Sequence, residues 1–234
     1  MSKHFFRPSM ALYGLWSRFD VVQQLASDME NIVESKINEL GERWEGLREV
    51  EDEEYRDHLS DSLADEHHSY QKEWIPLIRE SLLLSICSSF EFHLGRLCDE
   101  YAAACKSPFR ISDLNDRGIK RCRTMLRRLG VDDVAFGASW NALAQIFEIR
   151  NKIAHAGGFY DDSIRKKIGA RSDVFEQCEE FNRSIKIRAD GIQVVCEHMT
   201  EALRLVNRNL YLPSTENRTE QGGGGQAATR SEST

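Results

Sequence analysis

The chain has 234 residues, of which 41% are hydrophobic and 29% are charged, and its formal net charge at pH 7 is −7. This length and composition are typical of a globular protein with one substantial core. The negative net charge argues against a protein that binds nucleic acid over its whole surface, so any contact with RNA or DNA must come from a local basic patch.

The six cysteines and the N-terminal residues indicate a cytoplasmic protein. No two cysteines form a C-x-x-C pair, which argues against a zinc ribbon and a thioredoxin-type site. Residues 1–16 lack the continuous apolar run of a signal peptide, and the most apolar run, Ser81 to Cys87, is too short to span a bilayer. We therefore expect reduced thiols in the cytosol and no contact with a membrane.

Residues 1–69 are predicted to form an N-terminal helical extension that serves dimerisation or regulation. Residues 1–16 are too apolar for a loose tail and are expected to pack against the body of the protein or a partner chain. From residue 17 to about residue 48, apolar side chains recur every three to five positions, which predicts a long helix. The acidic run from Glu49 to Asp57 is interpreted as a solvated helix face or a connection.

Histidines beside acidic residues between positions 58 and 68 raise the alternative of a metal site. Carboxylate-bridged helical metal sites use Glu-x-x-His, and zinc proteases use His-Glu-x-x-His. The chain contains neither pattern, so we expect no metal and no other cofactor.

A second long helix is predicted from about Glu73 to Lys106. Its apolar residues form one wide face, which is typical of a helix at the centre of a bundle. Pro76 lies in the first turn, where proline is tolerated, and Ser107-Pro108 ends the helix. Glu91 is an acidic residue within this apolar helix. An exposed or ion-paired position would explain it without any functional role.

Two basic clusters follow on an otherwise acidic chain. The first lies on a short predicted helix that ends at Gly130, and the second follows Asp162. They consist of Arg117, Lys120, Arg121, Arg123, Arg127 and Arg128, and of Arg165, Lys166, Lys167 and Arg171. Contact with the phosphates of RNA and a plain solvated helix face are the two interpretations.

The remaining elements are three predicted helices and a hairpin. One helix is predicted from Ser139 to Ala156, closed by Gly157-Gly158, and residues 173–183 are expected to form a short helix. Residues 185–194 alternate around Asp190-Gly191, which predicts a small β-hairpin. The last helix is predicted from about Val194 to Leu210.

The predicted fold class is therefore all-α. We expect an up-and-down bundle of four to five helices over residues 70–212, preceded by the long extension and including the small hairpin. Residues 213–234 are polar and glycine-rich, and they are expected to be disordered.

The stretch from Arg150 to His155 carries the most specific pattern of the chain, R-N-x-x-x-H. A helix turns by about 100° per residue, so that with Arg150 at zero, Asn151 lies at roughly 100° and His155 at roughly 140°. The opposite arc is apolar and is formed by Ile146, Ile149 and Ile153. The polar groups thus face away from the core, and a cleft between two helices suits them better than a pocket within one.

With this pattern the chain resembles the HEPN superfamily, whose members are small all-α bundles with an arginine and a histidine separated by four to six residues. In that superfamily Asn, Asp or His commonly follows the arginine, as Asn151 does here. Residues 147–158 resemble the signature helix and its exit, and residues 88–94 resemble the long helix before it. The resemblance covers roughly residues 70–210.

The resemblance implies metal-independent RNA cleavage, because many members are endoribonucleases of toxin–antitoxin, abortive-infection or CRISPR-linked defence. Arg150, Asn151 and His155 are then the catalytic candidates. Glu91 corresponds to a glutamate that assists in some members. In some toxin members a partner nucleotidyltransferase modifies a tyrosine two residues after the histidine. Gly157 occupies that position in this chain, so regulation by this modification is not expected.

The chemistry of RNA agrees with this implication, since the 2′-OH of RNA can act as the nucleophile without a metal. Histidine exchanges protons near neutral pH, and the planar guanidinium of arginine suits phosphate oxygens. Asn151 is expected to bind a phosphate oxygen or to orient His155. A two-fold homodimer would supply two such motifs, as is common in the family.

The expected products carry a 2′,3′-cyclic phosphate and a 5′-OH. The RNA-binding candidates are Lys152, Arg117, Lys120, Arg121, Arg165, Lys166 and Lys167. An antitoxin or defence-system protein is the expected partner. Two alternatives stay open: a HEPN-like module that binds nucleotides or protein without catalysis, and a bundle that serves only for dimerisation.

Overall fold

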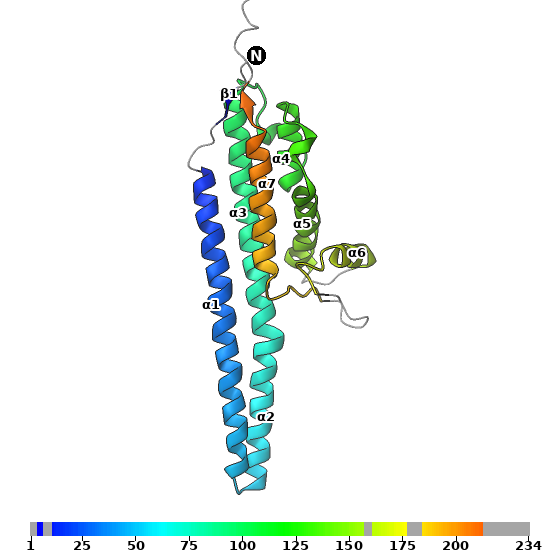
Figure 1. Cartoon of the computed structure of the whole chain (residues 1–234). Coiled ribbons are helices and arrows are strands. Elements are labelled where there is room, and N and C mark those ends of the chain that lie inside the picture. The colour runs from blue at the N-terminus through cyan, green and yellow to red at the C-terminus, as the bar shows by residue number, and fades with distance from the viewer. Residues whose placement is uncertain (1–3, 7–10, 157–160, 177–183, 213–234) are drawn as a thin grey trace, which may run out of the picture.

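The computed structural model describes residues 4–6, 11–156, 161–176 and 184–212. Helices dominate these ranges, which confirms the all-α prediction (Figure 1). The α-helices are α1 (Ala11–Gly46), α2 (Glu53–Ser69), α3 (Ile75–Ala104), α4 (Gly118–Arg128), α5 (Ala138–Ala156), α6 (Asp162–Ala170) and α7 (Gly191–Arg208). Short elements are η1 (Leu47–Glu49), η2 (Tyr70–Trp74), η3 (Ile111–Asp113), η4 (Asp133–Ala135), β1 (His4–Phe5) and β2 (Tyr211–Leu212).

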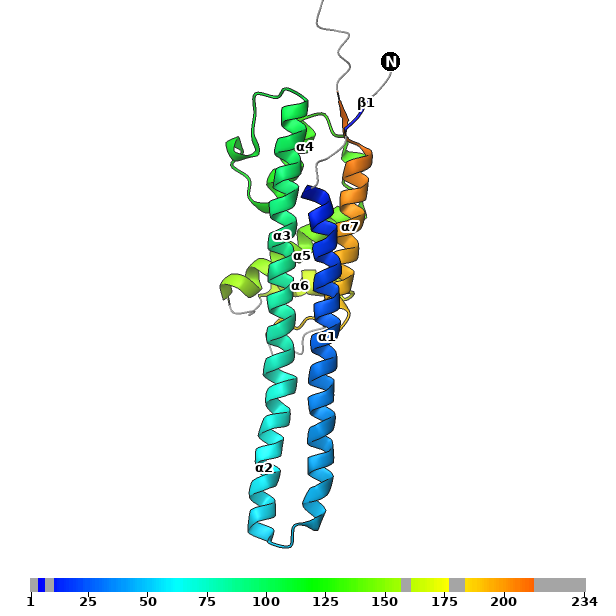
Figure 2. The same cartoon turned by 90° about the vertical axis from the view of Figure 1, so that its left-hand side faces the viewer.

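A long antiparallel hairpin of helices sets the shape of the molecule. Helix α1 runs away from the N-terminal end, η1 reverses the chain, and α2 returns beside α1 (Figures 1 and 2). Helix α2 passes through the π-helical turn η2 directly into α3. Pro76, which has no backbone N–H to donate, follows this turn at the start of α3, so the irregular hydrogen bonding lies where proline interrupts the regular helical pattern. Helices α4, α5 and α7 gather around the half of α3 that lies away from this hairpin tip (Figure 1).

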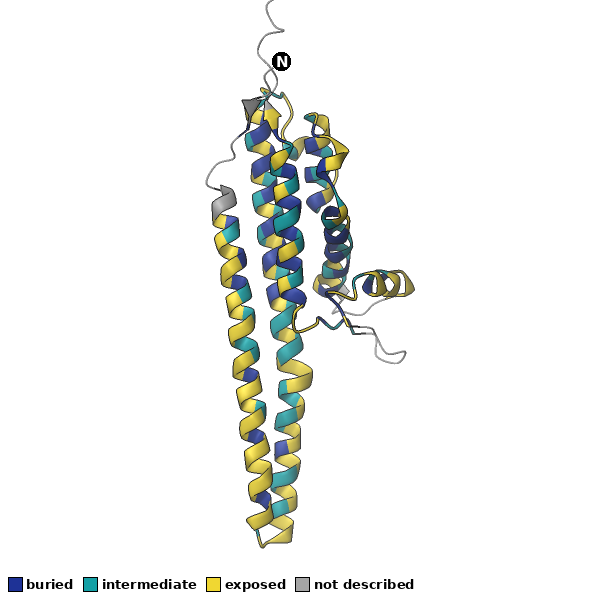
Figure 3. Cartoon of the chain, in the orientation of Figure 1, coloured by how far each residue is buried: buried dark blue, intermediate teal, exposed yellow. Residues whose placement is uncertain are grey.

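Helix α3 lies at the centre of the main core. Leu83, Ile86, Phe90 and Leu94 are fully buried, since α1, α4, α5 and α7 all pack against this helix. Burial is dense in this half of the molecule and sparse along the distal part of the hairpin (Figure 3). Among the described residues, no helix is both long enough and apolar enough to cross a bilayer.

Helix α1 takes part in two cores. Leu15 and Phe19 in its first half belong to the main core with α3. Leu40 in its second half forms a small separate cluster with Leu47 and Leu63. Residues 4–6 also contribute to the body, because Phe6 is buried and β1 pairs antiparallel with β2. The proposed role of residues 1–69 in dimerisation or regulation stays a prediction.

The hairpin predicted around Asp190-Gly191 is wrong. Gly191 begins α7 instead, because the residues that follow it bury an apolar face at helical spacing, which outweighs the local turn preference. Ile187 forms an isolated antiparallel bridge with Phe175, and Arg188 N donates to Val174 O over 3.0 Å. A Cβ at position 191 would lie 2.6 Å from Val174 O, so this close approach requires glycine.

Three further predictions fall wholly or partly on residues that the structure does not describe. The helix predicted at 173–183 is absent from residues 173–176, where the turn and the Phe175 bridge take its place, and residues 177–183 are not described. The predicted helix end at Gly157-Gly158 and the predicted disordered tail at 213–234 also lie outside the described residues. The start and end of α5 agree with the prediction to within one residue.

Arg79 ties α1 and the segment before α7 to α3. Its Nε and Nη2 bind the two carboxylate oxygens of Glu30 at 2.5 and 2.8 Å, and its Nη1 donates to Ile187 O over 2.9 Å. Only 13% of the Arg79 side chain is exposed, so these charge-assisted bonds are partly shielded from water.

We expect Arg79→Ala to lower the free energy of unfolding by about 2 kcal/mol, because it leaves Glu30 and the Ile187 carbonyl without their donor. Urea-induced unfolding followed by circular dichroism measures this. Arg204→Ala is the control, since the Arg204–Glu201 pair spans 3.9 Å and is exposed, and such pairs contribute about 0–1 kcal/mol. Equal stability of Arg79→Ala and wild type would contradict the assigned role of this contact.

Candidate functional site

A cavity of about 480 Å³ lies between α3, α4 and α5, and we call it the Arg150 cleft. It is lined by Glu91, Arg117, Gly118, Ile119, Lys120, Ala144, Phe147, Glu148, Arg150, Asn151 and His155. The four residues predicted to be catalytic therefore line one cavity, although Glu91 comes from α3 and the others come from α5. The expected location between helices agrees with this arrangement.

Arg150 is held at the cleft by two side-chain hydrogen bonds. Its Nη2 donates to Ser88 Oγ on α3 over 2.5 Å, and its Nη1 donates to Asn151 Oδ1 over 3.0 Å. Ser88 Oγ in turn donates to Leu84 O over 2.8 Å, which fixes the hydroxyl as the acceptor for Arg150. Arg150 Nε is buried and has no hydrogen-bond partner within the described ranges. Nη1 and Nη2 each have a second N–H that these two bonds do not use, so the guanidinium keeps donors for a ligand.

Asn151 and His155 are exposed, whereas Ile149 and Ile153 on the same helix are buried. This agrees with the predicted polar and apolar arcs of α5. Among the described residues Asn151 Oδ1 orients Arg150 and no bond joins it to His155, which differs from one of the two roles expected for Asn151. His155 is exposed and lines the cleft, so its imidazole is accessible to a ligand.

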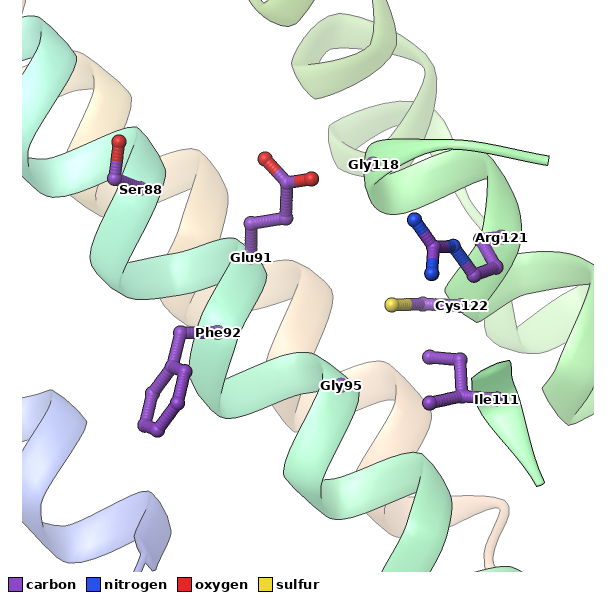
Figure 4. Close-up of a pocket in the computed structure, with 8 residues that line it drawn as sticks. All are labelled: Ser88, Glu91, Phe92, Gly95, Ile111, Gly118, Arg121 and Cys122. Atoms are coloured by element: carbon purple, nitrogen blue, oxygen red, sulfur yellow. The ribbon is translucent and has the colours of Figure 1, made fainter. Parts of the chain in front are cut away.

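Glu91 lies at the boundary between the Arg150 cleft and a second cavity of about 340 Å³, which we call the Arg121 cavity. The second cavity is lined by Ser88, Glu91, Phe92, Gly95, Ile111, Gly118, Arg121 and Cys122 (Figure 4). Gly118 opens α4 with a φ of 60°, and a Cβ there would lie 3.3 Å from Glu91 Oε1. Glycine at 118 therefore permits both this backbone conformation and the close approach of Glu91.

The basic residues predicted to bind RNA are divided between two environments. Lys120 and Lys167 both pair with Glu148, the former over 3.0 Å, and Lys152 pairs with Asp161 over 3.1 Å. Each of these ion pairs offsets part of the positive charge that the lysine could offer to RNA.

Two of the remaining candidates line a cavity and two do not. Arg117 lines the Arg150 cleft, and Arg121 lines the Arg121 cavity. Arg165 and Lys166 are exposed on α6 and line neither of them. The second basic cluster therefore lies outside the two cavities, apart from the link of Lys167 to Glu148.

Sequence reasoning missed Ser88, Gly118 and Glu148. Ser88 could have been found, because it precedes Glu91 by three residues and therefore shares its face of the helix. Gly118 and Glu148 could not, since their importance comes from contacts between helices that are distant in the chain.

The described residues offer little for metal or thiol chemistry. No group of three or more His, Cys, Asp or Glu side chains within them is placed to hold a metal ion. Cys87 is next to Ser88 in the chain, but it is completely buried, and burial raises the pKa of its thiol to about 12. The thiol therefore stays protonated and acts as a small apolar group.

We expect the link between Glu148 and its lysines to stabilise the fold in a pH-dependent way. The hydrogen bond from Lys167, followed by that from Lys120, lowers the pKa of Glu148 below 4.5. A lowered folded-state pKa gives stability that is present above the unfolded-state pKa and is lost as the pH falls through the folded-state pKa. The effect should be below about 1 kcal/mol, because a third of the side chain is exposed to solvent screening.

Urea unfolding of wild type and Glu148→Gln between about pH 6 and about pH 3 tests this. The wild type should be the more stable protein at the upper end of this range, and the difference should shrink toward the lower end. A difference that does not vary with pH would show that the ionised carboxylate is not its source.

No family model, no curated protein and no solved structure matches the chain. Any function assigned to it must come from its own residues and their geometry.

Proposed function

We propose that the chain is a metal-independent endoribonuclease of the HEPN type, with its active site in the Arg150 cleft. The observation that carries this proposal is that Arg150, Asn151, His155 and Glu91 line one cavity, although they come from two helices. A charged phosphate-binding group, a proton-exchanging imidazole and a carboxylate are the groups that RNA cleavage without a metal needs. The all-α fold is compatible with the helical bundle of that family.

In the proposed reaction the 2′-oxygen attacks the phosphorus, and the bond from phosphorus to the 5′-oxygen breaks. One group must accept the proton of the 2′-OH, and another must donate a proton to the leaving 5′-oxygen. His155 exchanges one proton, and Glu91 or the His155 of a second copy exchanges the other. The products are a 2′,3′-cyclic phosphate and a 5′-OH.

Arg150 stabilises the charge that develops on the phosphorane oxygens. Its contacts with Ser88 and Asn151 fix the guanidinium before substrate binds, so little reorganisation is needed during the reaction. Nη1 and Nη2 each carry a second N–H that neither contact uses, and these are the donors for a phosphate oxygen. Arg117 lines the same cavity and supplies further positive charge for the RNA backbone.

The proposal extends to assembly and biological role. A homodimer that apposes two Arg150 clefts would complete a composite active site. The activity would suit a cytoplasmic effector or toxin of prokaryotic defence that is held inactive by an antitoxin or another partner protein.

A HEPN-like module that binds a nucleotide or a protein is the second candidate. The observation in its favour is that Lys120, Lys152 and Lys167 are paired with Glu148 and Asp161, which reduces the positive charge available to a long RNA. Such a module would bind its ligand in the Arg150 cleft and release no RNA product.

We expect His155→Ala to lower RNA cleavage by about 10²–10⁴-fold, because it removes a proton-exchanging group. Arg150→Ala should lower cleavage by about 10²–10³-fold, through loss of charge stabilisation. Purified proteins are incubated with a mixed RNA pool in EDTA, and product ends are analysed for cyclic phosphate.

His58→Ala is the matched control, since His58 is exposed on α2, remote from the cleft. Cleavage by the folded His155→Ala variant at the wild-type rate would refute the proposed active site. Absence of cleavage by wild type would favour the binding module.

Ser88→Ala should lower kcat by about tenfold and change KM little. The hydroxyl only positions Arg150, and a hydrogen bond to a charged group contributes about 1.5 kcal/mol. Ser88→Thr, which keeps a hydroxyl, should restore most of the rate. Ser85→Ala, at an exposed position one helical turn earlier, should behave as wild type. Loss of activity in Ser88→Thr equal to that in Ser88→Ala would argue against positioning through the hydroxyl.

A further inference from the structure

The Arg121 cavity adjoins the Arg150 cleft, and the two share Glu91 and Gly118 as lining residues. Ser88 lines the Arg121 cavity and also binds Arg150, so it links the two spaces. In Figure 4 the side chain of Glu91 points from α3 toward α4, and that of Arg121 points from α4 back toward α3. A polymeric ligand that places one monomer in the Arg150 cleft can therefore place the neighbouring monomer in the Arg121 cavity.

The walls of the Arg121 cavity are suited to a flat ring. Ile111 forms an apolar wall, and its Cδ1 would lie in van der Waals contact, at 3.8 Å, with a Cβ added at Gly95, so a methyl group at 95 would fill the gap between α3 and Ile111. The Ile111 segment is anchored to α3 by the bond from Ile111 N to Asp99 Oδ1 over 3.0 Å. Hydrogen-bonding groups are placed at the other end by Glu91 and Arg121. An apolar wall next to a polar end matches one face and the edge of a nucleobase.

The polar end of the cavity favours an uncharged base over a phosphate group. Arg121 is the one cationic side chain among the residues that line this cavity, and Glu91 offsets its charge. The Arg150 cleft has an excess of cationic side chains, Arg117, Lys120 and Arg150, over the carboxylates of Glu91 and Glu148. A phosphate is therefore favoured there, and a neutral ligand is favoured beside Arg121. Arg121 has no ion-pair partner in the described part of the chain, so its donors are available to such a ligand.

Among the bases, guanine presents the edge that complements an arginine. The guanidinium offers parallel N–H donors, and guanine offers two adjacent acceptors, O6 and N7, which together form the most common specific arginine–base contact. Adenine places an amino donor beside its N7, so the same arginine would leave donors facing each other.

We propose that the Arg121 cavity binds a guanine base next to the scissile phosphate and that Arg121 is the residue that selects it. This inference rests on the proposed RNA cleavage for its setting in the reaction. Glu91 lines both cavities and would therefore lie between the base and the reacting phosphate.

Mapping of cleavage sites in a random-sequence RNA pool tests the selection. Wild type should cleave beside guanine with a preference of at least about tenfold over adenine. Arg121→Lys keeps the charge but loses the planar fork, so the ratio of cleavage beside guanine to cleavage beside adenine should fall toward one. Arg204→Lys, at an exposed position on α7, should retain the wild-type ratio.

Titration with guanosine and adenosine 3′-monophosphates, followed by the change in NMR signals, separates this inference from the nuclease proposal. Wild type should bind the guanosine nucleotide at least about tenfold more tightly, and Arg121→Lys should bind both alike. If wild type cleaves no RNA but shows this Arg121-dependent preference, the nuclease proposal fails and the guanine site stands. Cleavage without guanine preference, or equal binding of both nucleotides by wild type, would overturn the guanine site.

Discussion

The burial of α3 is the constraint on which the rest of the structure depends. Leu83, Ile86 and Phe90 are removed from water by the helices that pack around α3, and this burial is the main driving force for the fold. This part of α3 also carries polar side chains that stay at least partly accessible, among them Ser88 and Glu91. Burying such groups without hydrogen-bond partners would be unfavourable. Glu91 lines both cavities and Ser88 lines the Arg121 cavity, so the packing of α3 places polar groups at these two spaces.

The fold pairs several lysines with carboxylates and leaves mainly arginines to line the two cavities. Glu148 pairs with Lys120 and Lys167, which belong to the two basic clusters of the sequence, and Asp161 pairs with Lys152. What remains directed into the two cavities is chiefly arginine, from α4 and α5. Guanidinium groups are always charged and offer a planar set of donors, so they favour oriented contacts with phosphate or a base over loose attraction. An acidic protein can in this way present a small, directional basic site.

The two proposals are connected by proximity. If a guanine occupies the Arg121 cavity, the adjoining phosphodiester is brought to Arg150, because Glu91 and Gly118 border both spaces. Binding energy from the base then orients the reacting groups, which is an effective way to accelerate a reaction between them. The same two spaces would serve a nucleotide-binding module, in which recognition would not be followed by cleavage.

Sequence by itself determined the all-α class and the limits of α5, because helical apolar spacing is a local property that burial then satisfies. It also placed Arg150 and His155 on the polar side of one helix. Only the tertiary structure decided that Glu91 from α3 lines their cavity, that Ser88 holds Arg150, and that Gly191 begins a helix where local turn preference predicted a hairpin. These outcomes depend on which helices meet, and contacts between distant segments leave no periodic signal in the chain.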